Sequence, residues 1–298
     1  MIKREFLNDQ DVITFCNWLG EVISCDRGIH FRYQGGTDPT LIDAHIRYRW
    51  PNKRIDILPG GELTIYPDSN FAENAIILEK IGRGLRSSLE SSSTNPEELC
   101  SWLRATFVWG GVFTKRGKTG GNAGWLKSLN DRQELTQYWT RVRDVLAHVS
   151  DDDIGLELDD LRSNAGTTKV HSLLLTDWVI YDSRVAAALA WLVFKWSSGH
   201  PPPLLQFACM RPNTKKQKSR SPDQRIFKYF AATGSVREHR KHLKWNIRTN
   251  WILRAALDAA RKKRDPSSPP PFASLREIES ALFMVGDDLS LANGLEFP

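Results

Sequence analysis

Segment 166–184 places a small-residue turn, the lysine Lys169 and the aspartate Asp182 in one short unit, and both side chains are of types that can take part in bond-breaking chemistry. Asp182 comes directly before apolar residues at helical spacing, which predict that it opens a helix. A fixed carboxylate can stabilise positive charge that develops at a reacting carbon, and a lysine amine can act as a nucleophile that forms a Schiff base. Each residue also has a structural explanation, because Asp is a preferred N-cap residue and a surface lysine can contact phosphate.

The segment before Asp182 is predicted to form two short helices joined by a turn. Apolar residues at 154, 158 and 161 have the spacing of one helical face, and residues 162–166 (RSNAG) then form the turn. Gly166 suits positive φ or the close approach of another backbone, and Thr167 or Thr168 can cap the helix that follows. Such a pair of helices can present backbone N–H groups to a DNA phosphate. We therefore predict a phosphate-binding hairpin over residues 154–175.

Basic residues gather in the C-terminal third of the chain. Residues 211–264 hold seventeen Lys and Arg against three acidic residues, a net charge of +14 in a chain whose total is +6. This asymmetry is typical of a protein with a polyanionic partner, and the polar and aromatic residues among the basic ones favour nucleic acid over a membrane. On a helix predicted over 237–264, Lys241, Lys244 and Arg248 share one face, which we expect to contact the DNA backbone. An ordinary amphipathic surface helix has the same pattern.

The glycine- and lysine-rich segment 110–126 invites comparison with a phosphate-binding loop. That pattern requires a glycine five positions before Gly117, and the residue there is Val112. The segment also follows a predicted helix rather than a strand. We expect instead a flexible loop with three cations that contact DNA phosphates: Lys115, Arg116 and Lys118.

The sequence contains no clear motif for metal binding and no segment typical of a membrane span. The four cysteines are scattered and form no Cys-x-x-Cys pair, and Glu238 precedes both His239 and His242, so that no HExxH motif is present. No apolar stretch of about eighteen residues occurs, and the N-terminus lacks a signal-peptide pattern. We expect a cytoplasmic monomer that uses no metal or other cofactor.

The periodicity predicts a mainly α fold with a small β-containing N-terminal portion. Residues 1–72 are mixed, with a helix near 9–23 and strand-like pieces at 29–33 and 62–66. Residues 73–298 form the helical region. Its predicted helices, apart from those of the hairpin and the one after Asp182, cover residues 75–89, 97–109, 132–149, 237–264 and 275–285.

The segments AGTTKVHSLLL and VIYDSRVAAAL resemble the core of the helix-hairpin-helix DNA glycosylases. A small-residue hairpin, a helix, an apolar extended segment and an aspartate follow in the order of that family, and GTTKVHS is similar to the hairpin of the 8-oxoguanine glycosylases. The resemblance covers residues 154–196. This chain departs from the family pattern at the first hairpin glycine, which Asn164 or Ser163 replaces, and in a shorter link between hairpin and aspartate.

The resemblance implies a glycosylase-like helical fold in which Asp182 stabilises an oxocarbenium-like state. Family members with lyase activity use a hairpin lysine. Lys169 matches that residue when Thr-Lys-Val is aligned, whereas counting from Gly166 places Thr168 there. The resemblance also implies a pocket for a flipped base and a DNA-binding turn. Our candidates are Tyr181, Trp109 and Trp125 for the pocket, each of which core packing also explains, and Asn164, Gly166, Thr167 and Thr168 for the turn.

The expected activity is excision of a modified base from double-stranded DNA, which leaves an abasic site. Some relatives of this type remove hypermodified bases, such as glucosylated hydroxymethylcytosine, from phage DNA in antiviral defence. Two alternatives stay open. One is a repair glycosylase or lyase for oxidised bases such as 8-oxoguanine, and the other is a non-catalytic helix-hairpin-helix module that binds DNA.

Overall fold

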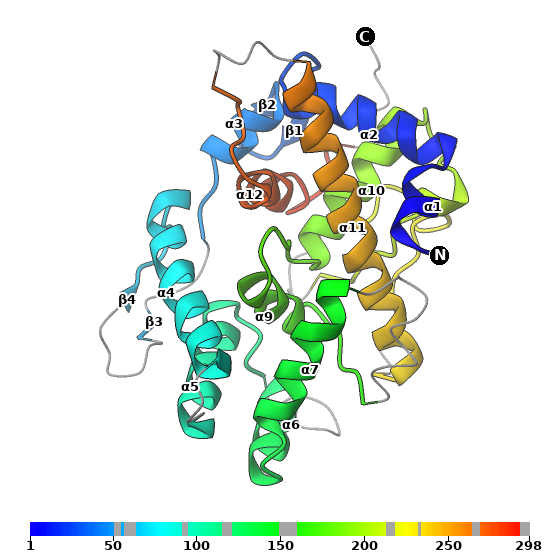
Figure 1. Ribbon diagram of the computed structural model, residues 1–298. Helices are drawn as coiled ribbons and strands as arrows, with labels where there is room; N and C mark the ends of the chain where they lie inside the picture. The colour runs from blue at the N-terminus through cyan, green and yellow to red at the C-terminus, as the bar shows by residue number, and fades with distance from the viewer. Residues whose placement is uncertain are drawn as a thin grey trace. The chain divides into compact units, whose positions relative to one another are not determined.

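The structure, a computed structural model, describes residues 1–50, 55–56, 64–90, 95–114, 121–148, 160–212, 218–231, 234–263 and 269–292. Over these residues the chain is mainly α-helical, as predicted, with two short antiparallel ribbons (Figure 1). It divides into two compact units. The first unit consists chiefly of Met1–Tyr48 and Val179–Pro298, and the second of Arg49–Val149 and Asp153–Trp178. The boundary that we predicted at residue 72 falls inside the second unit, because the helix that begins there packs against other helices of that unit.

The first unit surrounds a helix that is buried on all sides. This helix, α10 (Ser183–Trp196), has every residue from 185 to 193 buried, which its apolar composition explains. The other helices of the unit are α1 (Lys3–Leu7), α2 (Gln10–Ile23), α3 (Leu41–Ile46), α11 (Val236–Lys262), α12 (Leu275–Val285) and the single-turn η2 (Pro203–Leu205). Its ribbon pairs β1 (Phe31–Tyr33) with β2 (Gly36–Asp38).

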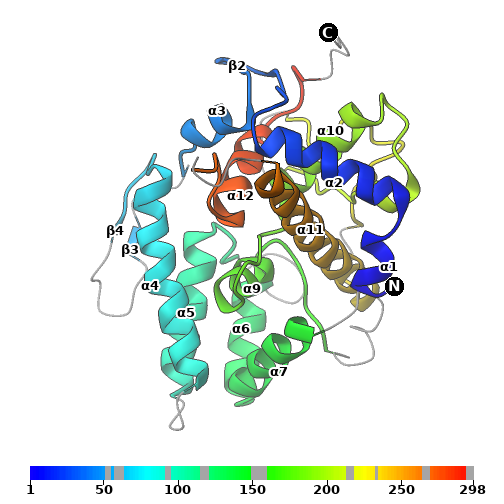
Figure 2. The ribbon, with the colours of Figure 1, turned by 45° about the horizontal axis from the view of Figure 1, so that its top comes forward.

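Small residues set how closely the helices of the first unit approach one another. Helix α2 lies along α11, and α12 packs between α3 and α10 (Figures 1 and 2). A Cβ atom on Gly20 of α2 would stand 3.0 Å from the Cβ of Ala259 in α11. Glycine and alanine at this crossing therefore allow a contact that larger side chains would prevent.

The second unit is built from helices and one short ribbon. Its helices are α4 (Phe71–Glu90), α5 (Pro96–Trp109), α6 (Gly121–Asp131), α7 (Leu135–His148) and α9 (Thr167–Leu174), and the ribbon pairs β3 (Ile55–Asp56) with β4 (Thr64–Ile65). Helix α4 packs against α5 and α9, and α5 contacts α6 and α7. The indoles of Trp50 and Trp109 stack with ring centroids 4.3 Å apart in its core.

The predicted helices agree with the structure to within a few residues at most ends, and side-chain caps explain several of the starts. Asp9, Asn95, Ser235 and Ser274 each accept hydrogen bonds from the first turn of the helix that they precede. The main difference is α6, which begins inside the segment that we predicted as a flexible loop. Its buried residues Asn122, Ala123, Leu126 and Leu129 supply the helical face that the glycines obscure in the sequence.

None of the helices in the described parts of the chain is both long enough and apolar enough to cross a membrane.

Candidate active site

Asp182 is the N-cap of α10, as its position in the sequence predicts. Its backbone is extended, and its Oδ1 accepts hydrogen bonds from the N–H groups of Arg184 at 2.9 Å and Val185 at 3.2 Å. The side chain is 9% exposed. The two hydrogen bonds fix the orientation of the carboxylate at the start of a buried helix, where the helix dipole also favours negative charge.

Buried polar side chains hold the extended segment that leads into Asp182. The Val179 N–H donates to Asn250 Oδ1 at 2.7 Å, and the Val179 carbonyl accepts from Asn246 Nδ2 at 2.9 Å. The Ile180 N–H donates to Glu279 Oε2 at 2.7 Å. This segment belongs to no strand of the structure, so these side chains of α11 and α12 supply the hydrogen bonds that a sheet would otherwise provide.

No sequence pattern singled out Asn246, Asn250 or Glu279. Asn246 and Asn250 are one helical turn apart on the buried side of α11, and Glu279 lies on the buried side of α12. Polar residues within an apolar helical stripe are the signal that could have identified them, because a buried polar group requires a partner.

Two further charged groups are electrostatically coupled to Asp182. Burial raises the pKa of Glu279, the nearby Arg276 opposes this rise, and the charge of Asp182 adds to it. Burial also lowers the pKa of Arg220, as does the charge of Arg184, while Asp287 and Asp182 favour the charged guanidinium. Arg220 is 4% exposed, so its guanidinium is a buried cation of the first unit whose charge interacts with that of Asp182.

A close backbone contact and a charge cluster fix the first turn of α10. A Cβ atom on Gly286, at the end of α12, would stand 1.8 Å from the carbonyl oxygen of Arg184. The Arg184 guanidinium pairs with Asp287 at 2.9 Å, and Arg220 donates to the Gly286 carbonyl at 2.8 Å. Burial by itself would raise the pKa of Asp287, but Arg184, Lys218 and Arg220 together lower it.

In the second unit, Asn164 organises the turn before α9. Its Oδ1 accepts from the N–H groups of Gly166 at 2.7 Å and Thr167 at 3.2 Å, and its Nδ2 donates to Asn122 Oδ1 at 3.1 Å. The prediction that Thr167 or Thr168 caps the helix is wrong: the amide of Asn164 performs that task. Both threonines are completely buried, so a direct contact with DNA would require their exposure.

Gly166 leaves space in this turn for the side chain of Asn122 and does not adopt positive φ. Its φ is −79°, and a Cβ atom would stand 2.3 Å from Nδ2 of Asn122. The N–H groups of residues 166 to 169 all have acceptors within the turn. A phosphate could bind to these N–H groups only by displacing such an acceptor. The first helix predicted for the hairpin, over 154–161, lies almost wholly outside the described residues.

Lys169 is buried within the second unit. It is 3% exposed, and its Nζ donates to the Ala165 carbonyl at 3.2 Å. Its Cδ lies 2.4 Å from the place that a Cβ on Gly110 would occupy, so the glycine makes room for the lysine stem. The alternative of a surface lysine is therefore wrong. Asp182 and Lys169 belong to different units.

Two of the three aromatic candidates for a base pocket are core residues. The Tyr181 hydroxyl donates to the Ala208 carbonyl at 2.7 Å, and the side chain is completely buried. Trp109 is 1% exposed and donates to Asn74 Oδ1 at 2.8 Å. The core explanation therefore applies to both.

Trp125 is the partly exposed member of that set. The guanidinium of Arg162 lies 5.2 Å from its ring centroid, in a cation–π contact, and also donates to Asn122 Oδ1 at 3.3 Å. Arg162 and Asn122 thus connect Trp125 to the turn at Asn164. We did not single out either residue in the sequence, because a lone Arg or Asn carries no motif.

The basic helix α11 presents fewer cations to solvent than its spacing predicts. Arg248 is 5% exposed, and its guanidinium lies 4.8 Å from the ring centroid of Phe6 and 5.5 Å from that of Trp245. The prediction that it faces DNA is wrong, because aromatic residues of the first unit cover it. Lys241 is exposed and Lys244 half-buried, and Arg237 and Arg240 extend the exposed basic surface toward the start of the helix.

Lys115, Arg116 and Lys118 lie outside the described residues. Within the described residues, no group of three or more His, Cys, Asp or Glu side chains is arranged to hold a metal ion.

Comparison of the chain with protein-family profiles finds no matching family, and comparisons with curated proteins and with solved structures find no match either.

Proposed function

We propose that this protein is a DNA glycosylase of the helix-hairpin-helix type, which excises a modified base from double-stranded DNA with Asp182 as the catalytic carboxylate. The observation that carries the proposal is the setting of Asp182. The carboxylate is oriented by two N–H groups of α10, it follows an extended segment held by buried side chains, and the cation of Arg220 is nearby. Such rigidity is what electrostatic stabilisation of a transition state requires.

The proposed reaction breaks the bond between C1′ of the deoxyribose and the base nitrogen. The electron pair of that bond leaves with the base, which takes up a proton, and positive charge develops on the sugar. The Asp182 carboxylate stabilises this charge and orients a water molecule that adds to C1′ and loses a proton. The products are the free base and an abasic site. Because the amine of Lys169 is buried and bonded to the Ala165 carbonyl, a monofunctional enzyme fits better than a lyase.

Among possible substrates we favour hypermodified cytosines of phage DNA, such as glucosylated hydroxymethylcytosine, and we place the enzyme in the cytoplasm. The reason is that the resemblance to repair glycosylases is confined to residues 154–196. Repair of oxidised bases is the alternative within the same reaction class. A panel of duplexes with normal, oxidised and glucosylated bases distinguishes the two by which base is released.

The decisive experiment compares Asp182→Asn with Asp9→Asn. Asn caps helices as well as Asp does, so both variants should fold. Asp9 Oδ1 caps α2 through the N–H groups of Asp11 and Val12, in the same pattern that Asp182 shows at α10. We expect Asp182→Asn to lose at least about a hundredfold in the rate of abasic-site formation, while Asp9→Asn keeps the wild-type rate. Full activity of Asp182→Asn would show that another group performs the reaction.

A non-catalytic DNA-binding protein is the second candidate. The exposed basic residues Arg237, Arg240 and Lys241 favour it independently of Asp182. In that case the wild-type protein binds duplex DNA in a salt-dependent manner but releases no base from any substrate in the panel. Borohydride trapping adds a test of the lyase reaction, and a covalent adduct that is lost in Lys169→Ala would contradict the monofunctional mechanism.

A further inference from the structure

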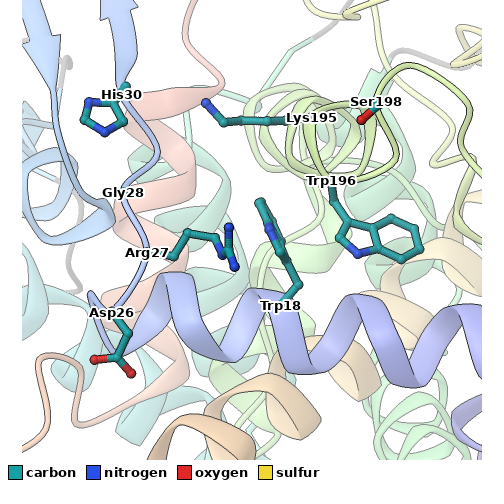
Figure 3. A pocket seen from close by; sticks show the side chains of 8 residues that line it. All are labelled: Trp18, Asp26, Arg27, Gly28, His30, Lys195, Trp196 and Ser198. Atoms are coloured by element: carbon teal, nitrogen blue, oxygen red, sulfur yellow. The ribbon is translucent and has the colours of Figure 1, made fainter. Parts of the chain in front are cut away.

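A cavity of about 510 Å³ in the first unit has an aromatic wall and a basic rim (Figure 3). The aromatic wall consists of Trp18, from α2, and Trp196, from the last turn of α10. The basic rim consists of Arg27 and His30, from the loop between α2 and β1, and of Lys195. The volume is in the range of small-molecule binding sites.

The aromatic wall rests on a buried support. Phe15 is completely buried, and its ring centroid lies 6.1 Å from that of Trp18 and 5.4 Å from that of Trp196. Both indoles are only partly buried and line the cavity. Phe15 therefore backs two partly exposed aromatic surfaces, which is an arrangement suited to stacking against a planar ring.

Backbone geometry supports the position of His30 in the basic rim. His30 has a φ of +46°, in the left-handed region that residues other than glycine seldom adopt. A Cβ atom on Gly28 would stand 2.7 Å from Nε2 of His30, so glycine at that position leaves space for the imidazole. Such strained positions often accompany binding sites.

Lys195 contributes a cation that has no carboxylate partner in the parts of the chain that the structure describes. Its Nζ donates to the Ile29 carbonyl at 2.9 Å, and among the described residues no carboxylate forms an ion pair with it. Burial lowers the pKa of this amine, so a bound anion would compensate the loss of hydration.

Arg27 and Asp26, the other charged residues that line the cavity with Lys195, are each bonded to a neighbouring side chain. The Nε and Nη2 atoms of Arg27 donate to Glu21 at 3.0 and 2.9 Å, and its guanidinium points toward Trp18 (Figure 3). Asp26 accepts a hydrogen bond from the Ser24 hydroxyl at 2.6 Å, and its carboxylate points away from the indoles. Arg27 is therefore already paired with Glu21, and Asp26 is bonded only to a hydroxyl, so Lys195 is the rim cation that has no carboxylate partner among the described residues.

We propose that this cavity binds a nucleotide, with the base stacked on the aromatic wall and the phosphate bound by the basic rim. The stacking surface accepts any base, and ammonium and guanidinium groups form charge-assisted hydrogen bonds with phosphate. A free nucleotide and the phosphorylated end of a nucleic acid strand share this chemistry. The inference does not rest on the proposed glycosylase activity, because Asp182 takes no part in the cavity.

Calorimetric titration of the full chain with 5′-AMP, adenosine, inorganic phosphate and a short 5′-phosphorylated oligonucleotide tests the proposal. We expect AMP or the oligonucleotide to bind more tightly than adenosine or phosphate alone. AMP binding identifies a free nucleotide as ligand, whereas binding of the oligonucleotide alone identifies a strand end. Binding of neither, or equal binding of AMP and adenosine, would overturn the proposal.

Substitutions of residues that line the cavity test whether the nucleotide binds there. Lys195→Met and Trp18→Leu should each weaken it about tenfold, because each removes one charge-assisted bond or one stacking surface. Lys3→Met, at an exposed lysine in α1 that does not line the cavity, should bind like wild type. Arg27→Gln alters an exposed residue and provides a rim variant if Lys195→Met does not fold. Unchanged affinity in folded Trp18→Leu and in a folded rim variant would exclude this cavity as the site.

Discussion

The carbonyl oxygen of Arg184 occupies the space beside Gly286, 1.8 Å from the point where a Cβ atom would stand. The first turn of α10, and with it Asp182, therefore rests directly on the backbone at the end of α12. The glycine is needed for this close approach and not for its own dihedral angles, because its φ is −80°.

Gly286→Ala should consequently destabilise the first unit and displace the N-cap. We expect a loss of about 3 kcal/mol in the free energy of unfolding, because the clash is with backbone that cannot rotate away. Gly234→Ala is the control: no described residue lies within 4 Å of the carbon added at Gly234, and its φ of +61° limits the cost to about 1 kcal/mol of backbone strain. Urea unfolding of the two variants measures the difference. Equal losses would show that α10 and α12 can separate at little cost.

Glu279 should make the stability of the protein depend on pH. Because burial raises the pKa of Glu279 in the fold, the protonated form is favoured there more than in the unfolded chain. Its contribution to stability is fully present below the unfolded pKa and is lost as pH rises through the folded pKa. In Glu279→Gln this loss is absent, so the stability of the variant relative to wild type should increase with pH over that window.

The measurement is the free energy of unfolding by urea at several pH values, for wild type and for Glu279→Gln. The pairing of Glu279 with Arg276, 2.9 Å away, exists only in the ionised form and is already included in the raised pKa. Differences in packing between Glu and Gln add an offset that does not depend on pH, so only the change of the difference with pH tests the prediction. The prediction is contradicted if the difference in free energy of unfolding between Glu279→Gln and wild type stays constant with pH, or if the variant becomes less stable relative to wild type as pH rises.

The turn before α9 should depend on the acceptor of Asn164. Asn164→Ala leaves the N–H groups of Gly166 and Thr167 without their acceptor, and we expect a loss of about 1–2 kcal/mol in unfolding free energy. Asn164→Asp keeps an acceptor and should recover most of the loss. If Asn164→Ala and Asn164→Asp are equally destabilised, the donor bond from Asn164 to Asn122 is the important one instead.

Local sequence patterns predicted the elements better than they predicted the partners. Asp182 was recognisable as a helix start because an N-cap and the apolar periodicity behind it are both local. The side chains that hold the segment before Asp182 could not be recognised in the same way, because Asn250 and Glu279 are 71 and 99 residues from the backbone groups that they bind. The outward face assigned to Arg248 was wrong for the same reason, since helical spacing does not reveal that Phe6, in another helix, covers it.

Arg248 of α11 is buried, whereas Arg240 and Lys241 are exposed. Substitutions at the buried and at the exposed positions should therefore have different effects on stability and on DNA binding. Arg240 and Lys241 are exposed, and Lys241 Nζ lies 5.3 Å from the ring centroid of Phe230, so Arg240→Gln and Lys241→Gln should each change the free energy of unfolding by no more than about 1 kcal/mol. If they contact DNA phosphates, each should weaken binding and reduce the slope of log K against log salt by about 1. Arg248→Gln should instead destabilise the first unit, because it removes the cation packed against the rings of Phe6 and Trp245.

Fluorescence anisotropy with labelled duplex DNA over a salt series, together with urea unfolding, distinguishes the two effects. A reduced salt slope in stably folded Arg248→Gln, with none in Arg240→Gln and Lys241→Gln, would mean that the DNA surface lies on the opposite side of α11.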